Sequence, residues 1–401
     1  MGKLEADRKI HVLFLLISQS VGGAEIHTVS LANGLDKAKF RVSVAFLKDE
    51  QDGTDLSHLL SDQVTVFCAN MMRRLDVGGL RMLCSYAKKE NVDIVACTNT
   101  FPLFYGWLVV RLLRIKITLA EVFHTTELDT LKTKLQMIFY RPFFHAADHV
   151  VFVCEAQRAY WRSRKLELSF SSVIHNGIDV TRFRNDFTNG EISSVRARFG
   201  FAESDFVVGI CASLRPEKAH IDLLDALILL KDQGYNFKCM IIGSGPERDR
   251  IERAIIARHL QNDVVLTGFI ADVRIYVAAC DVMVLASHYI ETFSLSALEA
   301  MALGKPMIMS EVGGAAEQVT HGYNGLLFPA GDTRALANAM LAVKKENADG
   351  KMSVNARKSV VERFSSEKMI STFEKTFLAM AGQEKSALSG SRSSTREKFD
   401  G

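Results

Sequence analysis

Short apolar runs alternate with longer amphipathic segments along nearly the whole chain, and few folds are compatible with this alternation. In the first half the apolar runs predict strands at Ile10–Ser18, Phe40–Leu47, Val64–Cys68, Val92–Cys97, Lys116–Leu119, His149–Val153 and Ser171–His175. Helical periodicity falls between them, for example at Ala24–Leu35, Leu80–Lys89 and Leu131–Phe144. Strands that alternate with helices in this way form a parallel sheet covered by helices on both faces.

The same rhythm starts again in the second half. Strands are expected at Phe206–Cys211, Phe237–Ile242, Val264–Leu266, Val282–Ala286 and Pro306–Met309, with helices at His220–Lys231 and Glu247–His259. Between the halves lie HNGID (His175–Asp179) and a polar stretch at 181–203 that we interpret as a linker. We therefore expect an α/β protein of two Rossmann-like doubly wound domains that face each other across a cleft, with a ligand beyond the carboxyl ends of the strands.

These patterns also suggest where the domains begin and end. Residues 1–180 would form the N-terminal domain and residues 181–363 the C-terminal domain. An amphipathic helix at about 364–382 could pack on either of them. The tail at 383–401 is poor in apolar residues, which predicts disorder.

Composition excludes several classes of protein. The chain has 401 residues, of which 48% are hydrophobic, and this is enough for two domains with separate cores. A net charge of +3 is too small to indicate nucleic-acid binding. The positive charge is uneven, however, because residues 70–165 hold 15 Lys/Arg against 8 Asp/Glu. Such a run usually marks solvated helix faces; the alternative is attraction to anionic lipid or to an anionic acceptor.

The cysteines and the apolar runs indicate the compartment. The seven cysteines are scattered and never spaced as Cys-x-x-Cys, which favours free thiols in a reducing cytoplasm over disulfides or a zinc site. The N-terminal apolar run is too short for a signal peptide. The longest apolar stretch, Phe101–Leu113, is interrupted by Arg111 and too short to cross a bilayer. We expect a cytoplasmic protein without a transmembrane anchor.

The stretch Leu285–Gly314 carries the clearest candidate site. It reads as a strand end, a loop with Glu291, and a helix that opens near Ser294. A helix N-terminus after a strand binds anions such as phosphate, whereas the carboxylates of Glu291 and Glu299 suit the hydroxyls of a ribose or a sugar. The alternatives are structural: Ser296 and Glu299 fit a capping box, and Glu291 could be a solvated loop residue.

Other candidate residues follow further strands. The pair Gly22-Gly23 could admit a phosphate or merely mark a turn, and Gly243 lies in a Gly-Ser-Gly turn that lacks the third glycine of a dinucleotide fingerprint. Arg215 and Lys218 suit a diphosphate, or form an exposed charged loop. His124 could contact a sugar or move a proton, although a lone histidine is more often structural.

Metal chemistry is disfavoured by the sequence. His145 and His149 straddle a helix end and a strand start, with no third ligand nearby. The chain contains no Asp-x-Asp, so a sugar transferase that anchors its nucleotide through a divalent metal is disfavoured. Arg215, Lys218 and the helix start at Ser294 would have to neutralise the charge of a phosphate.

Taken in order, these motifs resemble a known family. The series is GGAE, His124, HNGID, SLRPEK, GSGP, TGF, ETFSLSALEAMA, GKP, GGAAEQV and NGLLFPAGD. It is similar to the retaining glycosyltransferases of family 4 (glycosyl transferases group 1), which have the GT-B fold, over about Ile10 to Phe373. The two glutamates with seven residues between them, followed by Glu-Ala-Met-Ala-x-Gly-x-Pro, are the most specific part.

The resemblance implies a role for each matching residue. Catalytic roles fall to Glu291 at the sugar hydroxyls, His124 from the opposite domain, and Lys218 with Arg215 at the diphosphate. Glu299 would bind the ribose. Further donor contacts would come from Gly22, Gly23, Gly243, Phe269, Thr292, Phe293, Ser294 and Leu295. The final helix would pack back on the first, acceptor-side domain.

This chain departs from the family pattern at two places. The family's arginine most often stands at the position of Ser213, so Arg215 would have to replace it. Thr292 and Ser294 stand where the family usually has Pro or Gly and then Gly, and their side chains narrow the expected pocket.

The function implied is transfer of a sugar, with retention, from a UDP- or GDP-sugar to an acceptor hydroxyl in polysaccharide, lipopolysaccharide or glycolipid biosynthesis. The nucleotide-sugar is a substrate, and neither cofactor nor metal is expected. The acceptor would be a sugar or a lipid-linked glycan. A peripheral place at the inner face of the cytoplasmic membrane fits the basic first half. The alternatives are a non-catalytic nucleotide-sugar-binding subunit and a sugar epimerase of the same fold.

Overall fold

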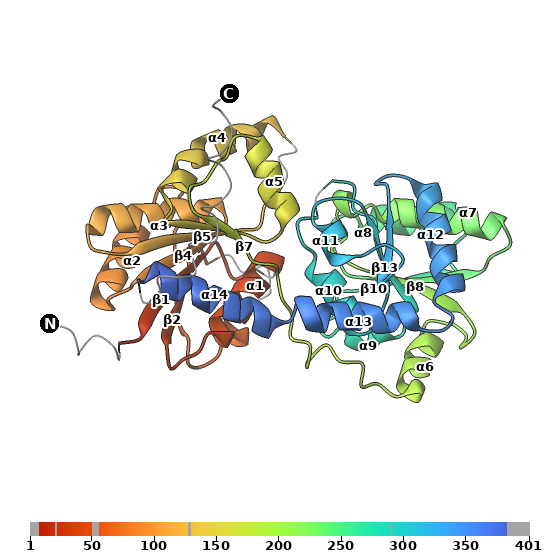
Figure 1. Ribbon diagram of the computed structural model, residues 1–401. Coiled ribbons are helices and arrows are strands. Elements are labelled where there is room, and N and C mark those ends of the chain that lie inside the picture. Colours follow the sequence, from red (N-terminus) through yellow and green to blue (C-terminus); the bar gives the residue numbers. More distant parts are fainter. Residues whose placement is uncertain (1–7, 21, 50–55, 127–129, 290, 383–401) are drawn as a thin grey trace, which may run out of the picture. The chain divides into compact units, whose positions relative to one another are not determined.

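The computed structural model describes residues 8–20, 22–49, 56–126, 130–289 and 291–382. The expected disordered tail at 383–401 lies outside these residues. The chain divides into two compact units (Figure 1). Unit 1 holds the residues up to Val153, then Arg158–Asn176 and the residues from Ser366 onward, and unit 2 holds Cys154–Gln157 and Gly177–Ser365. The structure thus divides the chain a few residues before the expected boundary at 180.

Unit 1 contains a parallel sheet of seven strands within the described residues. Their order is β3 (Thr65–Cys68), β2 (Phe40–Phe46), β1 (Ile10–Leu16), β4 (Ile94–Thr98), β5 (Thr118–Phe123), β6 (His149–Phe152) and β7 (Ser171–Val173). The helices are α1 (Gly23–Gly34), α2 (Val77–Lys89), α3 (Thr100–Leu113), α4 (Leu131–Ala146), α14 (Ser366–Met380) and α5 (Glu155–Ser163), which spans the division at residue 157.

Both faces of this sheet are buried, as a doubly wound fold requires. Alternate residues of β1 enter different cores: Val12 and Phe14 join the cluster that includes α14, and Leu13 and Leu15 join the cluster that includes α2, α3 and α4. The last helix therefore belongs to unit 1, where α14 packs against α1. The Asp36 N–H at the end of α1 donates to Glu374 of α14 at 2.7 Å.

Two elements of unit 1 differ from the sequence expectation. The apolar stretch Phe101–Leu113, which had no assigned element, forms most of helix α3. The strand expected at Lys116–Leu119 is β5, and it runs on to Phe123. Glu121 is fully buried there, but as a charged residue it interrupts the apolar pattern. The sequence pattern therefore does not predict the second half of the strand.

Unit 2 contains a parallel sheet of six strands within the described residues. Their order is β10 (Val264–Gly268), β9 (Phe237–Ile242), β8 (Phe206–Cys211), β11 (Val282–Leu285), β12 (Met307–Ser310) and β13 (Gly325–Phe328). The helices are α6 (Asn189–Arg198), α7 (His220–Asp232), α8 (Arg248–Ala257), α9 (Arg274–Ala278), α10 (Leu295–Ala302), α11 (Ala315–Gln318), α12 (Thr333–Glu346) and α13 (Lys351–Arg363). The strand order reverses between β8 and β11, where doubly wound proteins bind ligands.

The interpretation of 181–203 as a linker was wrong in part, because this segment contains helix α6. Thr188 and Glu191 form a capping box at its start. Near its end the buried Arg196 donates to both carboxylate oxygens of Asp281, each at 3.0 Å. Apolar periodicity could not reveal this helix, because a charge pair and not an apolar stripe anchors it to the unit.

Candidate functional site

The reversal of strand order in unit 2 brings two charged residues together. Lys218 ends a 3-10 turn (Pro216–Lys218) that follows β8, and Glu291 lies in the loop that follows β11. Lys218 Nζ lies 2.5 Å from Glu291 Oε2, and only 19% of the lysine and 9% of the glutamate side chain are exposed. Ser287 Oγ donates to the same oxygen at 3.1 Å. Glu291 is therefore not a solvated loop residue, and within the described chain its Oε1 has no hydrogen-bond partner.

The N-terminus of helix α10 lies next to this pair in sequence. Ser294 is its N-cap, and its Oγ accepts from the Ala297 N–H at 3.2 Å. Because the first N–H groups of a helix have no acceptor within it, those of Leu295 and Ser296 can bind an anion. The alternative of a capping box between Ser296 and Glu299 is wrong, since Ser294 is the N-cap of the helix.

Gln318, which sequence reasoning missed, holds this helix start in place. Its side chain is fully buried; its Oε1 accepts from the Ser294 N–H at 3.1 Å and its Nε2 donates to the Ser294 carbonyl at 2.8 Å. Asn324, also fully buried, donates to the carbonyl of Gln318 at 3.1 Å. These contacts fix the backbone of Ser294, and nothing in the local sequence around Gln318 indicates them.

Glu299 is desolvated without an ion-pair partner. Burial raises the pKa of its carboxyl to about 7, and the charge of Arg182 lowers it only in part. The described chain offers its carboxylate no hydrogen bond. It lies near the end of β8, where its charge adds to the burial that raises the pKa of Cys211 to about 12. A shielded acceptor of this kind suits a hydroxyl donor.

The other expected donor residues of unit 2 differ in accessibility. Arg215 is exposed, and its guanidinium makes no ion pair with any described residue. Phe269 is 65% exposed just after β10. Phe293 is buried with its ring 5.3 Å from that of Phe364, so it can offer only its backbone to a ligand. Thr292 is half-buried, and its carbonyl accepts from the Gly314 N–H at 2.9 Å.

Gly243 has a structural reason to be glycine. Its φ is +145°, and a Cβ there would lie 2.1 Å from the carbonyl oxygen of Ala212. This close approach lets Leu214 N–H donate to the Ser244 carbonyl at 2.9 Å. Gly243 thereby supports the loop that carries Arg215 and Lys218.

In unit 1, His124 follows β5 and is held by its surroundings. Its backbone N–H donates to Asn99 Oδ1 at 3.0 Å, and its ring meets that of His27 edge-on with centroids 4.8 Å apart. Burial lowers its pKa well below the ordinary value, with a smaller effect from His27, whose own pKa burial lowers to about 4. Both rings are neutral at pH 7. This favours a hydrogen-bonding role for His124 over proton transfer.

Two residues near His124 were not predicted from the sequence as candidate site residues. Asn99 follows β4 as the N-cap of α3, with φ +68° and ψ 175°, a region that residues other than glycine rarely adopt. Glu121 on β5 is fully buried, and burial raises the pKa of its carboxyl well above the ordinary value, which the backbone of Asn99 offsets only in part. Gly22 and Gly23 stand at the start of α1, with the side chain of Glu25 lying against Gly22.

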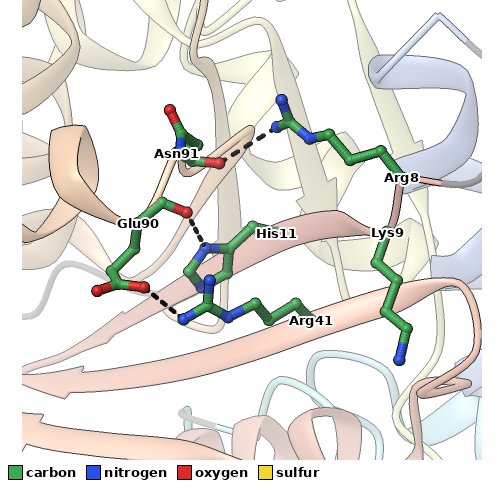
Figure 2. A pocket seen from close by; sticks show the side chains of 6 residues that line it. All are labelled: Arg8, Lys9, His11, Arg41, Glu90 and Asn91. Carbon is green, nitrogen blue, oxygen red and sulfur yellow. Dashed lines mark hydrogen bonds and ion pairs between the residues drawn. The ribbon is translucent and has the colours of Figure 1, made fainter. Parts of the chain in front are cut away.

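A separate pocket of about 290 Å³ lies at the opposite edge of the unit 1 sheet (Figure 2). Its basic residues are largely neutralised: Arg8 pairs with Asp93 and Arg41 with Glu90, both at 2.5 Å. It lies at the amino ends of β1 and β2, so it does not belong to the candidate site.

Comparison with known families shows which proteins this chain resembles. The sequence matches the family model "Glycosyl transferases group 1" over residues 191–359 and the family model "Glycosyltransferase Family 4" over residues 21–182. The first match contains Lys218, Glu291 and Glu299, and the second contains His124. The chain belongs to the group 1 glycosyltransferases.

Relatives of this transferase include the N-acetyl-alpha-D-glucosaminyl L-malate synthase of Bacillus anthracis, 27% identical over 76% of this chain and 79% of that protein. An Escherichia coli UDP-Gal:alpha-D-GlcNAc-diphosphoundecaprenol alpha-1,3-galactosyltransferase is 24% identical over 81% of this chain and 86% of its own. The crystal structure of Anabaena HepE in complex with UDP-glucose has a TM-score of 0.79 at 24% identity, and covers 92% of this chain and 100% of that one. This likeness confirms the GT-B fold.

Because of Glu299, the free energy of unfolding of the transferase should fall as the pH rises from about 5 to about 8. Its pKa is about 7 when folded and 4.5 as an ordinary glutamate, so the folded state binds more protons in this interval and stability falls through it. We expect wild type to lose about 1–3 kcal/mol relative to Glu299→Gln over this range, measured by urea unfolding. The exposed Glu346→Gln serves as control; an equal pH effect in both variants would contradict the assignment.

Proposed function

We propose that this glycosyltransferase moves a sugar, with retention, from a UDP-sugar to an acceptor hydroxyl. The observation that carries the proposal is the Lys218–Glu291 pair beside the start of α10, at the point where the strand order of unit 2 reverses. The E. coli relative is named for UDP-Gal, and the Anabaena neighbour binds UDP-glucose. A GDP-sugar is the alternative donor.

Each group of the site has a chemical task in this proposal. Lys218, Arg215 and the free N–H groups of α10 stabilise the diphosphate as negative charge grows on it, which is the largest catalytic contribution. Glu291 offers its Oε1 to a sugar hydroxyl while Oε2 holds Lys218. Glu299 accepts from the ribose, and the neutral His124 contacts the sugar.

We also propose that no divalent metal is needed, because these cationic groups can neutralise the diphosphate and the chain lacks Asp-x-Asp. Transfer should then be unchanged in excess EDTA. Retention would appear in the proton NMR spectrum of the first product as an anomeric configuration equal to that of the donor.

Calorimetric titration with UDP, GDP and ADP, followed by their sugar conjugates, tests the donor. We expect UDP to bind at least tenfold more tightly than the other two. Binding without transfer to any acceptor would favour a nucleotide-sugar-binding subunit, and conversion of the donor without an acceptor would favour an epimerase. If none of the nucleotides binds, the donor site is wrong.

The acceptor is proposed to be a sugar or a lipid-linked glycan at the inner face of the cytoplasmic membrane. The E. coli relative is named for a diphosphoundecaprenol acceptor. In the described part of this chain, no helix combines the length and the apolar character needed to cross a membrane.

A further inference from the structure

Helix α4 of unit 1 exposes large apolar side chains. Leu131, Leu135, Ile138 and Phe139 follow an i, i+4, i+7, i+8 spacing and are between 56% and 72% exposed. The opposite side of the helix is already buried through Met137, Tyr140 and Phe144, in the core that also contains α3. A helix on the surface of a soluble domain normally turns polar residues outward, so a contiguous apolar face marks an interaction site.

The loop before α2 also exposes large apolar side chains. Met72 and Leu75 are 88% and 70% exposed. The hydroxyl of Tyr105 on α3 donates to the Arg74 carbonyl at 3.0 Å, and the charge of Arg74 acts on Tyr140 of α4. The loop and α4 therefore lie on the same side of unit 1. We define the α4 patch as Met72, Leu75, Leu131, Leu135, Ile138 and Phe139.

The surroundings of the α4 patch are basic. Residues 72–82 and 127–146 hold three acidic residues, Asp76, Glu127 and Asp129, against six basic ones: Arg73, Arg74, Arg81, Lys132, Lys134 and Arg141. Within the described chain none of the six forms an ion pair with a carboxylate. Their charges are available to an anionic partner.

We propose that the α4 patch docks this transferase on an anionic lipid bilayer. Apolar side chains of a helix enter the boundary between headgroups and acyl chains, and flanking Lys and Arg attract anionic headgroups. A second copy of this chain fits less well, because a symmetric contact would bring six cations against six others. The inference deepens the proposed function by naming the surface that meets a lipid-linked acceptor.

Sedimentation with vesicles tests this directly. We expect the full-length protein to pellet with vesicles that contain one third phosphatidylglycerol, and not with pure phosphatidylcholine. Salt at 1 M, where the screening length is about 3 Å, should abolish the difference. The double variant Leu135→Ser/Ile138→Ser should bind at least tenfold more weakly, and Lys132→Gln/Lys134→Gln roughly thirtyfold more weakly.

A matched control comes from unit 2. Ile256 and Val354 are 58% and 68% exposed, the same as Leu135 and Ile138, so Ile256→Ser/Val354→Ser should pellet like wild type. The proposal fails if wild type does not pellet with anionic vesicles. It also fails if Leu135→Ser/Ile138→Ser pellets as well as the control Ile256→Ser/Val354→Ser. It also fails if wild type is a dimer that only Leu135→Ser/Ile138→Ser dissociates.

UDP binding separates this result from the proposed function. None of the substituted residues belongs to the donor site, so calorimetry should give the same UDP affinity for every variant. A protein that binds UDP but no vesicles would overturn the docking surface alone, whereas loss of UDP binding in wild type would overturn the donor site.

Discussion

Replacing Lys218 with alanine should lower the rate of sugar transfer by about tenfold to a few hundred-fold. A charge-assisted contact to a phosphate contributes about 1.5–3 kcal/mol, and this contact strengthens as the diphosphate leaves. The fall should appear in kcat, measured from initial rates at saturating donor, because the added charge develops only during the reaction. Unchanged turnover would remove Lys218 from the site.

Folding has to be separated from catalysis in this experiment. Alanine at 218 leaves the nearly buried Glu291 carboxylate without its cation, which costs about 3–5 kcal/mol of stability. The double variant Lys218→Met/Glu291→Gln removes both charges and should recover most of that stability. Transfer should stay low in the double variant; recovery of the rate would show that Lys218 acts only through folding.

Lys238 supplies a second control. It pairs with Asp263 at 2.8 Å with side-chain exposures of 12% and 10%, close to those of the Lys218–Glu291 pair, although Asp263 also pairs with Lys231 at 2.8 Å. Lys238 on β9 lies opposite Val207 at the amino end of β8, whereas the candidate site follows the carboxyl ends of β8 and β11. Lys238→Ala should therefore lower the unfolding free energy without changing kcat.

The sequence was sufficient for the parts of the fold that apolar periodicity controls. Buried parallel strands such as β8, β9 and β11 read as short apolar runs, and their alternation with helices predicts the doubly wound topology. Apolar periodicity does not predict an element that polar groups hold in place. The capping box and Arg196 secure α6, and the buried Glu121 conceals half of β5.

The candidate site could be predicted as a set of residues but not as a geometry. Local pattern put Glu291 after one strand and Lys218 after another, and only the pairing of β8 with β11 brings their charges within 2.5 Å. Local pattern also favoured a capping box for Glu299, because the choice between Ser294 and Ser296 depends on where the helix begins. The contribution of Gln318 depends on a contact 24 residues away.

Gly313→Ala should destabilise the protein by about 3 kcal/mol or more and weaken UDP binding. Gly313 has φ +53°, where alanine costs about 1–2 kcal/mol. In addition, its Cβ would lie 1.9 Å from the carbonyl oxygen of Glu291, a backbone atom that cannot move without shifting the loop. The Gly314 N–H donates to the carbonyl of Thr292 at 2.9 Å, so displacement of this turn also moves the approach to α10.

Gly331→Ala measures the conformational cost alone, so the difference between the two variants gives the effect of the contact with Glu291. Gly331 has φ +77°, and a Cβ added there would meet no described atom within 4 Å, so alanine carries only the conformational cost of about 1–2 kcal/mol. Urea unfolding and UDP titration of both variants give the comparison. If the two lose equal stability and both keep wild-type UDP affinity, the contact between Gly313 and the Glu291 backbone does not position the donor site. A larger loss for Gly313→Ala in both measurements would show that this glycine sets where Glu291 stands, because the methyl group can be accommodated only by moving that loop.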